Sequence, residues 1–277
     1  MSAGDEMGRN STVVVAALCT ALAGTAALAD SAWATRSELG YALARGNSDT
    51  ENGNFKFGAA RLLGRWQYNF GLDGLYGASN GINTAERWDA HLQTDLKLNE
   101  HTFWFGALRY EDDRFGGFQY QASLSSGFGH IFMKTDTNKL SAQIGAGVRQ
   151  LRPEELVRDD RGAVIDRIPG ERADDGLLSG SVAYQHSFNP STKLIEGLLV
   201  ESGRANTSLR NSLALQVKMS TSLALAVGWQ VNRNSSPPPG VLSRTDTLTT
   251  VNLVYEIKDP KITPSAVALT QLMATAK

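Results

Sequence analysis

Residues 66–76, WQYNFGLDGLY, decide the fold class of this chain. The even-numbered positions from Trp66 to Leu72 are large and apolar, and the odd-numbered positions from Gln67 to Asp73 are polar or small. Successive side chains of a β-strand project to opposite sides, so a period of two marks a strand with two unlike faces. Residues 87–98, RWDAHLQTDLKL, repeat the pattern with charges on the polar face. The pattern continues from Arg36 onward and predicts an all-β chain.

Strand length decides how the apolar face is buried. Soluble sandwiches and membrane barrels both contain such strands. Ordinary strands have about five or six residues, whereas a tilted strand needs roughly 9 to 11 to span a bilayer. The stretches here are of the longer kind and predict a transmembrane antiparallel β-barrel of about twelve strands, at residues 35–45, 51–63, 66–77, 85–98, 102–112, 119–132, 139–151, 177–188, 192–202, 207–219, 222–232 and 246–257.

The connections between these stretches alternate in length. The even-numbered ones are tight, and most odd-numbered ones are longer, including 78–84, the charged segment 152–176, and 233–245 with Pro237-Pro238-Pro239. Outer-membrane barrels have short turns in the periplasm and longer loops outside. An even strand count then places both ends of the barrel in the periplasm.

The turn Gly64-Arg65 fixes a register, because the flanking Leu63 and Trp66 should pair and face the same side. Both are apolar, so both are expected to face lipid. The expected lipid face also holds Leu39, Tyr41, Leu43, Phe55, Phe57, Trp104, Leu108, Tyr110, Leu124, Phe128, Phe132, Ile144, Val148, Val182, Tyr184, Leu213, Leu215, Leu223, Leu225, Val227, Trp229, Val251, Leu253 and Tyr255. The expected lumen lining is Glu38, Lys56, Asp73, Asp89, His91, Asp95, Lys97, Arg109, Glu111, Arg149, Arg210, Lys218 and Glu256.

One strand has an open register, and the aromatic residues give two further expectations. The stretch 192–202 carries Glu196 on one face and Glu201 on the other, so its register stays open. Phe103 and Phe105 are expected to face inward and to fill part of the lumen. Four tryptophans are expected near strand ends, where aromatic girdles lie at the membrane interfaces: Trp66, Trp88, Trp104 and Trp229.

The N-terminus is typical of an export signal. An apolar stretch from Val13 to Leu28 ends in Ala27-Leu28-Ala29, and Ala32-Trp33-Ala34 offers a second cleavage site. Acidic residues near the start suggest Met7 as an alternative first residue, with a short basic region after it. We therefore expect a signal peptide at 1–29, a barrel at 30–257 and a periplasmic tail at 258–277. The single cysteine, Cys19, lies in the signal, so the mature chain is expected to have no disulfide.

Composition excludes two classes of protein. The chain is 42% hydrophobic, yet no apolar run reaches the roughly 18 residues that a membrane-spanning helix needs, which excludes a helical membrane protein. The formal net charge is -1 and the basic residues are scattered, which argues against a nucleic-acid partner.

Several motifs resemble the domain-of-unknown-function 481 family, outer-membrane barrels sometimes labelled salt-induced outer-membrane proteins. They are Glu38-Leu39-Gly40-Tyr41, Gly46-Asn47-Ser48-Asp49-Thr50, the segment RYEDDRFGGF at 109–118, and Gly127-Phe128-Gly129-His130. The resemblance covers roughly residues 33–257 and implies a barrel in the outer membrane with no known activity. The segment 152–176 is enlarged relative to the family, and residues 259–277 continue past the final strand.

Two of these motifs have local interpretations. Gly46-Asn47 suits a hairpin turn, because such turns need positive φ angles. Glu111, Asp112, Asp113 and Arg114 form an external-loop charge cluster. It could bind a divalent cation or a phosphate–metal bridge of lipopolysaccharide, or it could be a solvated loop with internal ion pairs.

Enzyme motifs are weak. His186-Ser187 are neighbours in a strand, so their side chains project to opposite faces and cannot share a proton. The other histidines lack metal-type spacing, and H-E-x-x-H does not occur. His91 shares a face with Asp89 and Gln93, and we interpret it as a polar group lining the lumen.

The sequence therefore predicts a non-enzymatic outer-membrane protein without cofactor or metal, serving as a narrow pore for small polar solutes or as a structural component of the envelope. Expected partners are outer-membrane lipid, the barrel-assembly machinery during biogenesis, and a small polar solute. One alternative is a lipid-modifying enzyme, which would lose hydrolysis when His91 or Ser187 becomes Ala. Another is a soluble periplasmic β-sandwich binding protein, which would not show heat-modifiable migration in detergent gels.

Overall fold

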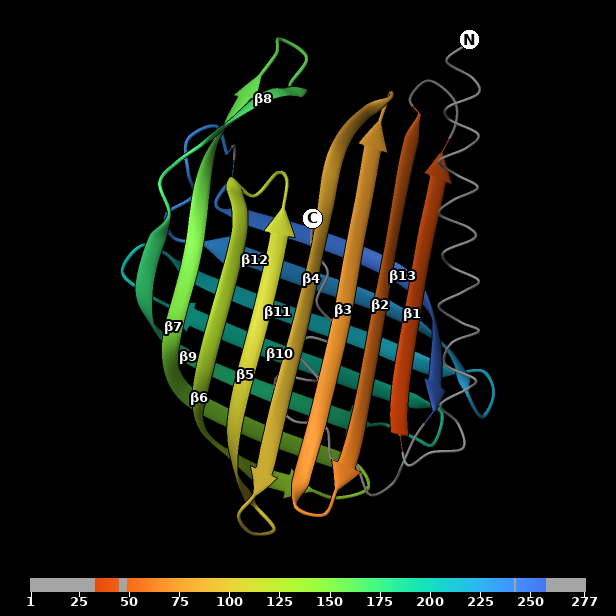
Figure 1. Ribbon diagram of the computed structural model, residues 1–277. Coiled ribbons are helices and arrows are strands. Elements are labelled where there is room, and N and C mark those ends of the chain that lie inside the picture. The colour runs from red at the N-terminus through yellow and green to blue at the C-terminus, as the bar shows by residue number, and fades with distance from the viewer. Residues whose placement is uncertain (1–32, 45–48, 242, 258–277) are drawn as a thin grey trace.

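The computed structural model describes residues 33–44, 49–241 and 243–257 (Figure 1). The described chain contains thirteen strands: β1 (Trp33–Ala44), β2 (Thr50–Leu63), β3 (Trp66–Ser79), β4 (Ile82–Lys97), β5 (Thr102–Asp113), β6 (Phe118–Lys134), β7 (Asn138–Arg158), β8 (Val164–Pro169), β9 (Ala173–Ser187), β10 (Thr192–Ser202), β11 (Thr207–Lys218), β12 (Leu223–Asn234) and β13 (Thr245–Ile257).

Twelve of these strands close into one antiparallel barrel. The order β6-β5-β4-β3-β2-β1-β13-β12-β11-β10-β9-β7 returns on itself through pairing of β6 with β7, and β8 is added to the far end of β7 (Figure 1). A continuous closed sheet excludes the two-sheet sandwich and confirms the predicted fold class. Among the described residues, no helix is long and apolar enough to cross a membrane.

The expected long connection at 78–84 is wrong. β3 and β4 extend through this segment and are joined by a two-residue turn, Asn80-Gly81, in which both residues have positive φ (50° and 77°). Asn-Gly is the preferred sequence for such a turn. The register shifts by one residue between Gly77 and Ala78, so that Asp73 pairs with Asp89. This bulge brings the inward residues of the two strands into line.

The segment 152–176 is more ordered than the charged loop that the sequence predicts. β7 continues to Arg158, turns at Gly162 and pairs with β8, and β9 already begins at Ala173. Glu154 and Arg167 join the two strands of this projecting hairpin, with 3.2 Å between Oε1 and Nη1. Burial raises the pKa of the Glu154 carboxyl, so this ion pair is lost at a higher pH than one made by an exposed glutamate.

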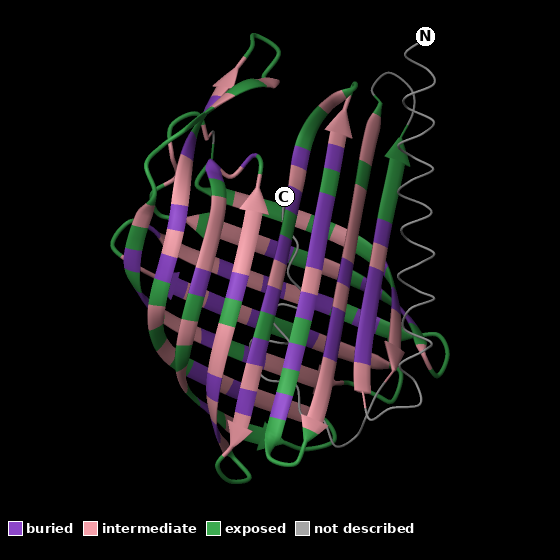
Figure 2. Cartoon of the chain, in the orientation of Figure 1, coloured by how far each residue is buried: buried purple, intermediate pink, exposed green. Residues whose placement is uncertain are grey.

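The two faces of the sheet are those that the alternation predicts. Buried and more exposed residues alternate along the strands (Figure 2). Leu63 pairs with Trp66 and both are exposed on the outside, as expected. Other large apolar side chains remain similarly exposed, among them Leu108, Leu124, Phe128, Ile144, Val148 and Val251. A closed barrel with an apolar outer face satisfies its backbone hydrogen bonds within lipid, and the chain is an outer-membrane barrel.

Aromatic side chains gather near both ends of the strands. Near the short turns, Trp66 and Trp104 lie edge to face with ring centroids 6.4 Å apart. Near the opposite end, Trp88 stacks on Tyr110 at 5.0 Å. These positions fit interfacial girdles. Trp229 differs from the prediction, because it lies in the middle of β12.

The open register of β10 is resolved by its neighbours. Glu201 is buried in the lumen, whereas Glu196 is exposed on the outer face opposite Tyr184. Phe103 and Phe105 face inward, and Phe105 is only 1% exposed. A side chain at Gly129 would collide with Phe103, and one at Gly145 with Phe105. The small residues of β6 and β7 therefore make room for these two rings.

Three predictions fall outside the described residues. They are the signal peptide at 1–29, the Gly46-Asn47 turn and the tail at 258–277. The described part of the predicted barrel, 30–257, begins at Trp33.

We expect Gly127→Ala to destabilise the barrel. A Cβ at Gly127 would lie 2.1 Å from the Ile144 carbonyl oxygen and 2.5 Å from the Gly145 Cα, and backbone atoms cannot move aside without disturbing the β6–β7 pairing. Overpacking of this kind costs about 1–3 kcal/mol of unfolding free energy. Urea unfolding of the refolded barrel in detergent measures it, with Gly176→Ala as control because a Cβ there meets nothing within 4 Å. Equal losses in the two variants would contradict the explanation.

Candidate functional site

The lumen is lined by charged and amide side chains. The structure buries nine of the thirteen predicted lumen residues inside the barrel: Glu38, Lys56, Asp73, Asp89, His91, Asp95, Arg109, Arg149 and Arg210. They come from different strands, and the alternation of each strand turns them inward. They belong to several separate groups along the lumen.

Arg109 is the centre of the largest group. Its Nε donates to Asp89 Oδ2 at 2.8 Å and its Nη1 donates to Glu201 Oε2 at 2.9 Å, while Nη2 pairs with Glu111. Glu201 also accepts a hydrogen bond from the Ser123 hydroxyl. One guanidinium thus contacts three carboxylates, which uses the fork of donors that arginine provides.

Two further arginines complete this group. Arg87 Nη2 lies 3.0 Å from Glu111 Oε1, and Arg210 Nη2 lies 3.0 Å from Glu111 Oε2. Arg210 Nη1 also lies 3.6 Å from Asp89 Oδ2. We call these six residues the central cluster: Arg87, Arg109, Arg210, Asp89, Glu111 and Glu201. Three cations face three anions, so the cluster is neutral overall.

The central cluster spans the lumen from wall to wall. Arg87 and Asp89 come from β4, Arg109 and Glu111 from β5, and the others from β10 and β11. The pair β4–β5 and the pair β10–β11 are far apart in the sheet order. A bond such as Arg109–Glu201 therefore crosses the barrel rather than running along its wall.

A second charged group lies near the short turns. Arg36 contacts Glu38 at 2.6 Å and also pairs with Glu256, which receives Lys193 Nζ at 3.1 Å. Arg36 Nη1 further donates to the Gln216 side chain at 2.7 Å. Between the walls of β3, β4 and β7, an amide layer surrounds Asp95, with hydrogen bonds from Asn69 and Gln93.

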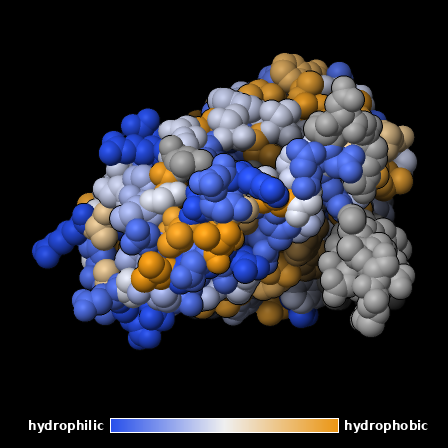
Figure 3. Space-filling view, turned by 90° about the horizontal axis from the view of Figure 1, so that it is seen from above, coloured by the Kyte–Doolittle hydropathy of each residue, from blue (hydrophilic) through white to orange (hydrophobic). Residues whose placement is uncertain are grey.

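The opposite mouth is covered by loops. Arg149 donates to the Asn206 carbonyl oxygen at 2.7 Å and pairs with Asp175 at 3.4 Å. The segment 235–241 reaches across to the extended part of β7, where the Leu156 amide donates to the Pro239 carbonyl oxygen. Figure 3 views this end, where hydrophilic side chains surround a patch of apolar ones.

Two cavities of very different size lie on either side of the central cluster. A cavity of about 710 Å³ occupies the end with the short turns and is lined by Arg36, Lys193, Gln216 and Glu256, with Ile195. Toward the opposite mouth, a cavity of about 40 Å³ is lined by central-cluster residues together with Arg149, Arg233 and Asp246. The lumen thus has a vestibule at the end with the short turns and a constriction at the central cluster.

The structure separates Glu111 from the other three residues of the predicted external-loop charge cluster, Asp112, Asp113 and Arg114. Glu111 projects into the lumen and belongs to the central cluster, because it shares strand parity with Arg109. Asp113 accepts hydrogen bonds from the backbone amides of Phe115 and Gly116 and so shapes the β5–β6 turn. Arg114 pairs instead with Glu86 on the exposed rim, at 2.7 Å.

Sequence reasoning missed several residues of these groups, among them Arg87, Arg36, Glu201 and Lys193. Arg87 has the same parity as Asp89 and His91, so the alternation of β4 could have assigned it to the lumen. Arg36 has the parity of Glu38. Glu201 could not be assigned, because β10 carries a glutamate on each face and an apolar residue, Leu199, on the lumen side.

The neighbours His186 and Ser187 are separated as their parity requires. Ser187 lines the vestibule, whereas the His186 ring lies near Phe188 and its Nδ1 is 2.9 Å from Asn138 Oδ1. No hydroxyl is hydrogen-bonded to His91 among the described residues. The geometry offers neither histidine as the base for a serine nucleophile.

Comparison with known proteins identifies relatives of this chain. The family described as "Protein of unknown function, DUF481" matches residues 37–257. The uncharacterized protein YdiY of Escherichia coli (strain K12) is 26% identical over 180 residues, which are 65% of this chain and 66% of that protein.

Solved structures of similar shape are also barrels. The NanC porin matches with a TM-score of 0.47 and 8% identity over 82% of this chain and 100% of its own. The KdgM porin gives 0.41 and 9% over 82% and 99%, and the translocator domain of the autotransporter NalP from Neisseria meningitidis gives 0.40 and 12% over 90% and 98%. These values are low, so the architecture rests on the closed sheet itself.

We expect Arg109→Ala to destabilise the barrel strongly. The change leaves Asp89, Glu111 and Glu201 buried without their shared cation, and breaking a buried ion pair from one side costs about 3–5 kcal/mol. Arg114→Ala is the control, because its pair with Glu86 is exposed and such pairs contribute about 0–1 kcal/mol. Urea unfolding in detergent compares the two. A similar small loss in both variants would show that the central cluster does not hold the walls together.

Proposed function

Since this chain belongs to the DUF481 family, and since its lumen has a vestibule that ends at the central cluster, we propose that it is a narrow outer-membrane pore for small polar solutes. The single observation that carries the proposal is the contrast between the vestibule of about 710 Å³ and the constriction at the central cluster. A purely structural barrel would not need a wide vestibule.

The chemistry of the lumen suits small polar solutes. The vestibule and the constriction present cations, anions and amides together, so neither sign of charge is strongly favoured. The charged and amide groups of the vestibule and the constriction can replace the water that a polar solute loses on entry. The lumen is therefore expected to select by size and polarity rather than by charge.

The central cluster is proposed to keep the pore closed or nearly closed at rest. Its bonds cross the lumen, and passage requires at least the Arg109–Glu201 contact to separate. Three arginines and three carboxylates can exchange partners without leaving a charge unpaired, which lowers the cost of such rearrangements relative to breaking an isolated pair. We expect low, intermittent conductance in the unmodified barrel.

An enzymatic role has less support. We treat the chain as a non-enzyme, because His186 and Ser187, which come nearest to a histidine–nucleophile pair, lie on opposite faces of β9. The expected partners remain those of a membrane pore: outer-membrane lipid around the barrel, the assembly machinery during biogenesis, and a small polar solute within.

The double variant Arg109→Ala/Glu201→Ala tests the pore. It removes both partners of a contact across the lumen, and it leaves Arg87 and Arg210 to balance Asp89 and Glu111. We expect single-channel conductance in planar bilayers to rise several-fold over the unmodified barrel, because the constriction loses two large side chains.

The matched control is Arg114→Ala/Glu86→Ala, which removes an arginine–glutamate pair from the exposed rim and should leave conductance unchanged. Heat-modifiable migration in gels verifies that each variant is folded. A folded lumen variant that conducts no more than the unmodified barrel at any voltage would overturn the pore and favour a structural role in the envelope.

A further inference from the structure

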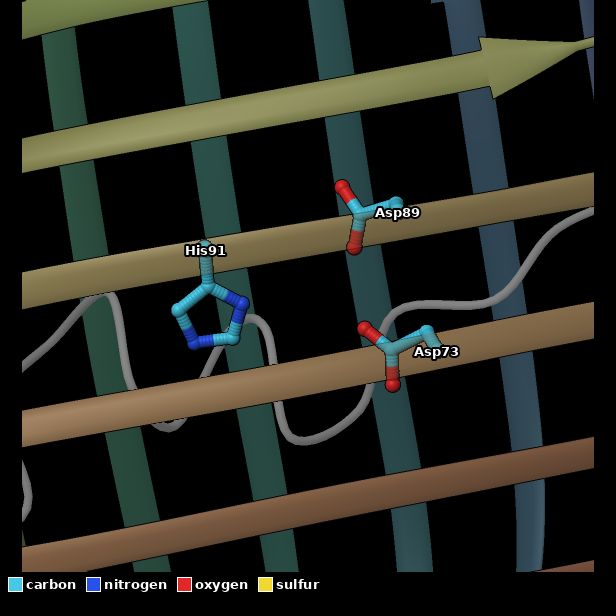
Figure 4. Close-up of side chains that lie close together, drawn as sticks. All are labelled: Asp73, Asp89 and His91. Atoms are coloured by element: carbon cyan, nitrogen blue, oxygen red, sulfur yellow. The ribbon is translucent and has the colours of Figure 1, made fainter.

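A group of three potential metal ligands lies on the lumen wall beside the central cluster. Among the described residues, Asp73, Asp89 and His91 each offer one ligand atom, and these atoms lie within 4.8 Å of one another. Figure 4 shows Asp73 on β3 beside Asp89 and His91 on β4. The register explains the grouping, because Asp73 pairs directly with Asp89 and His91 follows two residues later on the same face.

The ligand atoms of this group are buried and lack donor partners. Asp73 is 1% exposed, and neither of its carboxylate oxygens accepts a hydrogen bond from a nitrogen or hydroxyl donor; the side chain instead faces the Asp89 carboxyl. Asp89 Oδ1 likewise has no such donor, nor has His91 Nδ1, in a histidine that is 4% exposed. Buried polar atoms are normally satisfied, so a cluster of unsatisfied acceptors is a reason to look for a missing cation.

The surroundings hold the ligands in place without using these atoms. Arg109 binds the other oxygen of Asp89, Oδ2, and thereby orients the carboxylate. A Cβ built on Gly71 would lie 1.8 Å from His91 Cε1, so the imidazole occupies the space that the glycine leaves free. Second-shell hydrogen bonds and fixed ring positions of this kind are typical of metal ligands.

Nearby cations balance the two carboxylates only in part. Lys56 lies opposite Asp73 in the β2–β3 register, but among the described residues no ion pair within 4 Å joins their side chains. Asp89 shares Arg109 and Arg210 with the glutamates of the central cluster. Two adjacent carboxylates in the wall therefore still favour a divalent charge between them.

From these observations we propose that Asp73, Asp89 and His91 bind a divalent cation of the Zn²⁺ type. One imidazole and two carboxylates form a donor set that suits Zn²⁺, and three protein ligands leave a fourth position for water. Tetrahedral ligands about 2.1 Å from zinc lie roughly 3.4 Å apart, so the side chains need shifts on the order of 1 Å to close on the ion. This site goes beyond the proposed pore and does not depend on it.

The test uses a barrel in which His91 is the sole histidine. The chain has 4 histidines, so His101→Gln/His130→Gln/His186→Gln removes the three others. Refolded in detergent and dialysed against ZnCl₂, this barrel is expected to retain one zinc per chain. Asp73→Asn and His91→Gln, each added to it, should weaken zinc binding about tenfold or more.

Two further variants separate ligation from general changes in the lumen. Asp95→Asn changes a buried carboxylate on the same face of β4 that already has amide partners, and it should leave zinc affinity unchanged. Gly71→Ala keeps all three ligands but displaces the imidazole, and it should weaken binding. With Co²⁺ in place of zinc, visible absorption should report a tetrahedral site that His91→Gln abolishes.

Folding is checked by heat-modifiable migration. Asp73→Asn is expected to fold at least as well as the parent without metal, because it removes an unpaired buried charge. A folded parent that binds no zinc would overturn the proposal and would indicate that the two aspartates share a proton instead. Equal zinc affinity in the parent, Asp73→Asn and His91→Gln, or equal affinity for Mg²⁺ and Zn²⁺, would overturn it as well.

Discussion

Closure of the sheet is the constraint on which the rest of the structure depends. Pairing of the first strand, β1, with the last, β13, joins the ends of a series of hairpins, so every barrel strand has two neighbours and no edge is left to face hydrocarbon. The close approach of β6 to β7 requires small residues, because Gly127 and Gly147 each lie against backbone atoms of the opposite strand. In the same two strands, Gly129 and Gly145 leave the space that the rings of Phe103 and Phe105 fill, so the wall of the closed barrel also shapes the lumen.

Closure also turns a collection of inward charges into a network. Once the sheet is a ring, Arg109 on β5 meets Glu201 on β10 and Arg210 on β11 meets Glu111 on β5, so the lumen is crossed by ion pairs rather than lined by isolated groups. Such pairs contribute little net stability compared with apolar packing, but removing one partner is costly. This asymmetry favours a constriction that holds its shape until its charges rearrange together, as a gated narrow pore would require.

The wall of the lumen beside this network has a different character. The central cluster satisfies its charges with one another, whereas Asp73, Asp89 and His91 keep unsatisfied atoms that face each other. Asp89 belongs to both groups through its two oxygens. A cation held there would add a fixed positive charge next to Arg109, and the charge balance of the constriction would then depend on whether the cation is bound.

The sequence by itself determined the barrel, its strands and the faces of all but one of them, because alternation, strand length and turn chemistry are local properties. The pairing of Leu63 with Trp66 followed from a two-residue turn. Only the tertiary structure decided which inward side chains meet. Arg109 and Glu201 are 92 positions apart, and their contact depends on closure and on the stagger of the strands. Asp73 faces Asp89 because of a bulge at Gly77, a one-residue shift that the pattern of apolar and polar residues does not reveal.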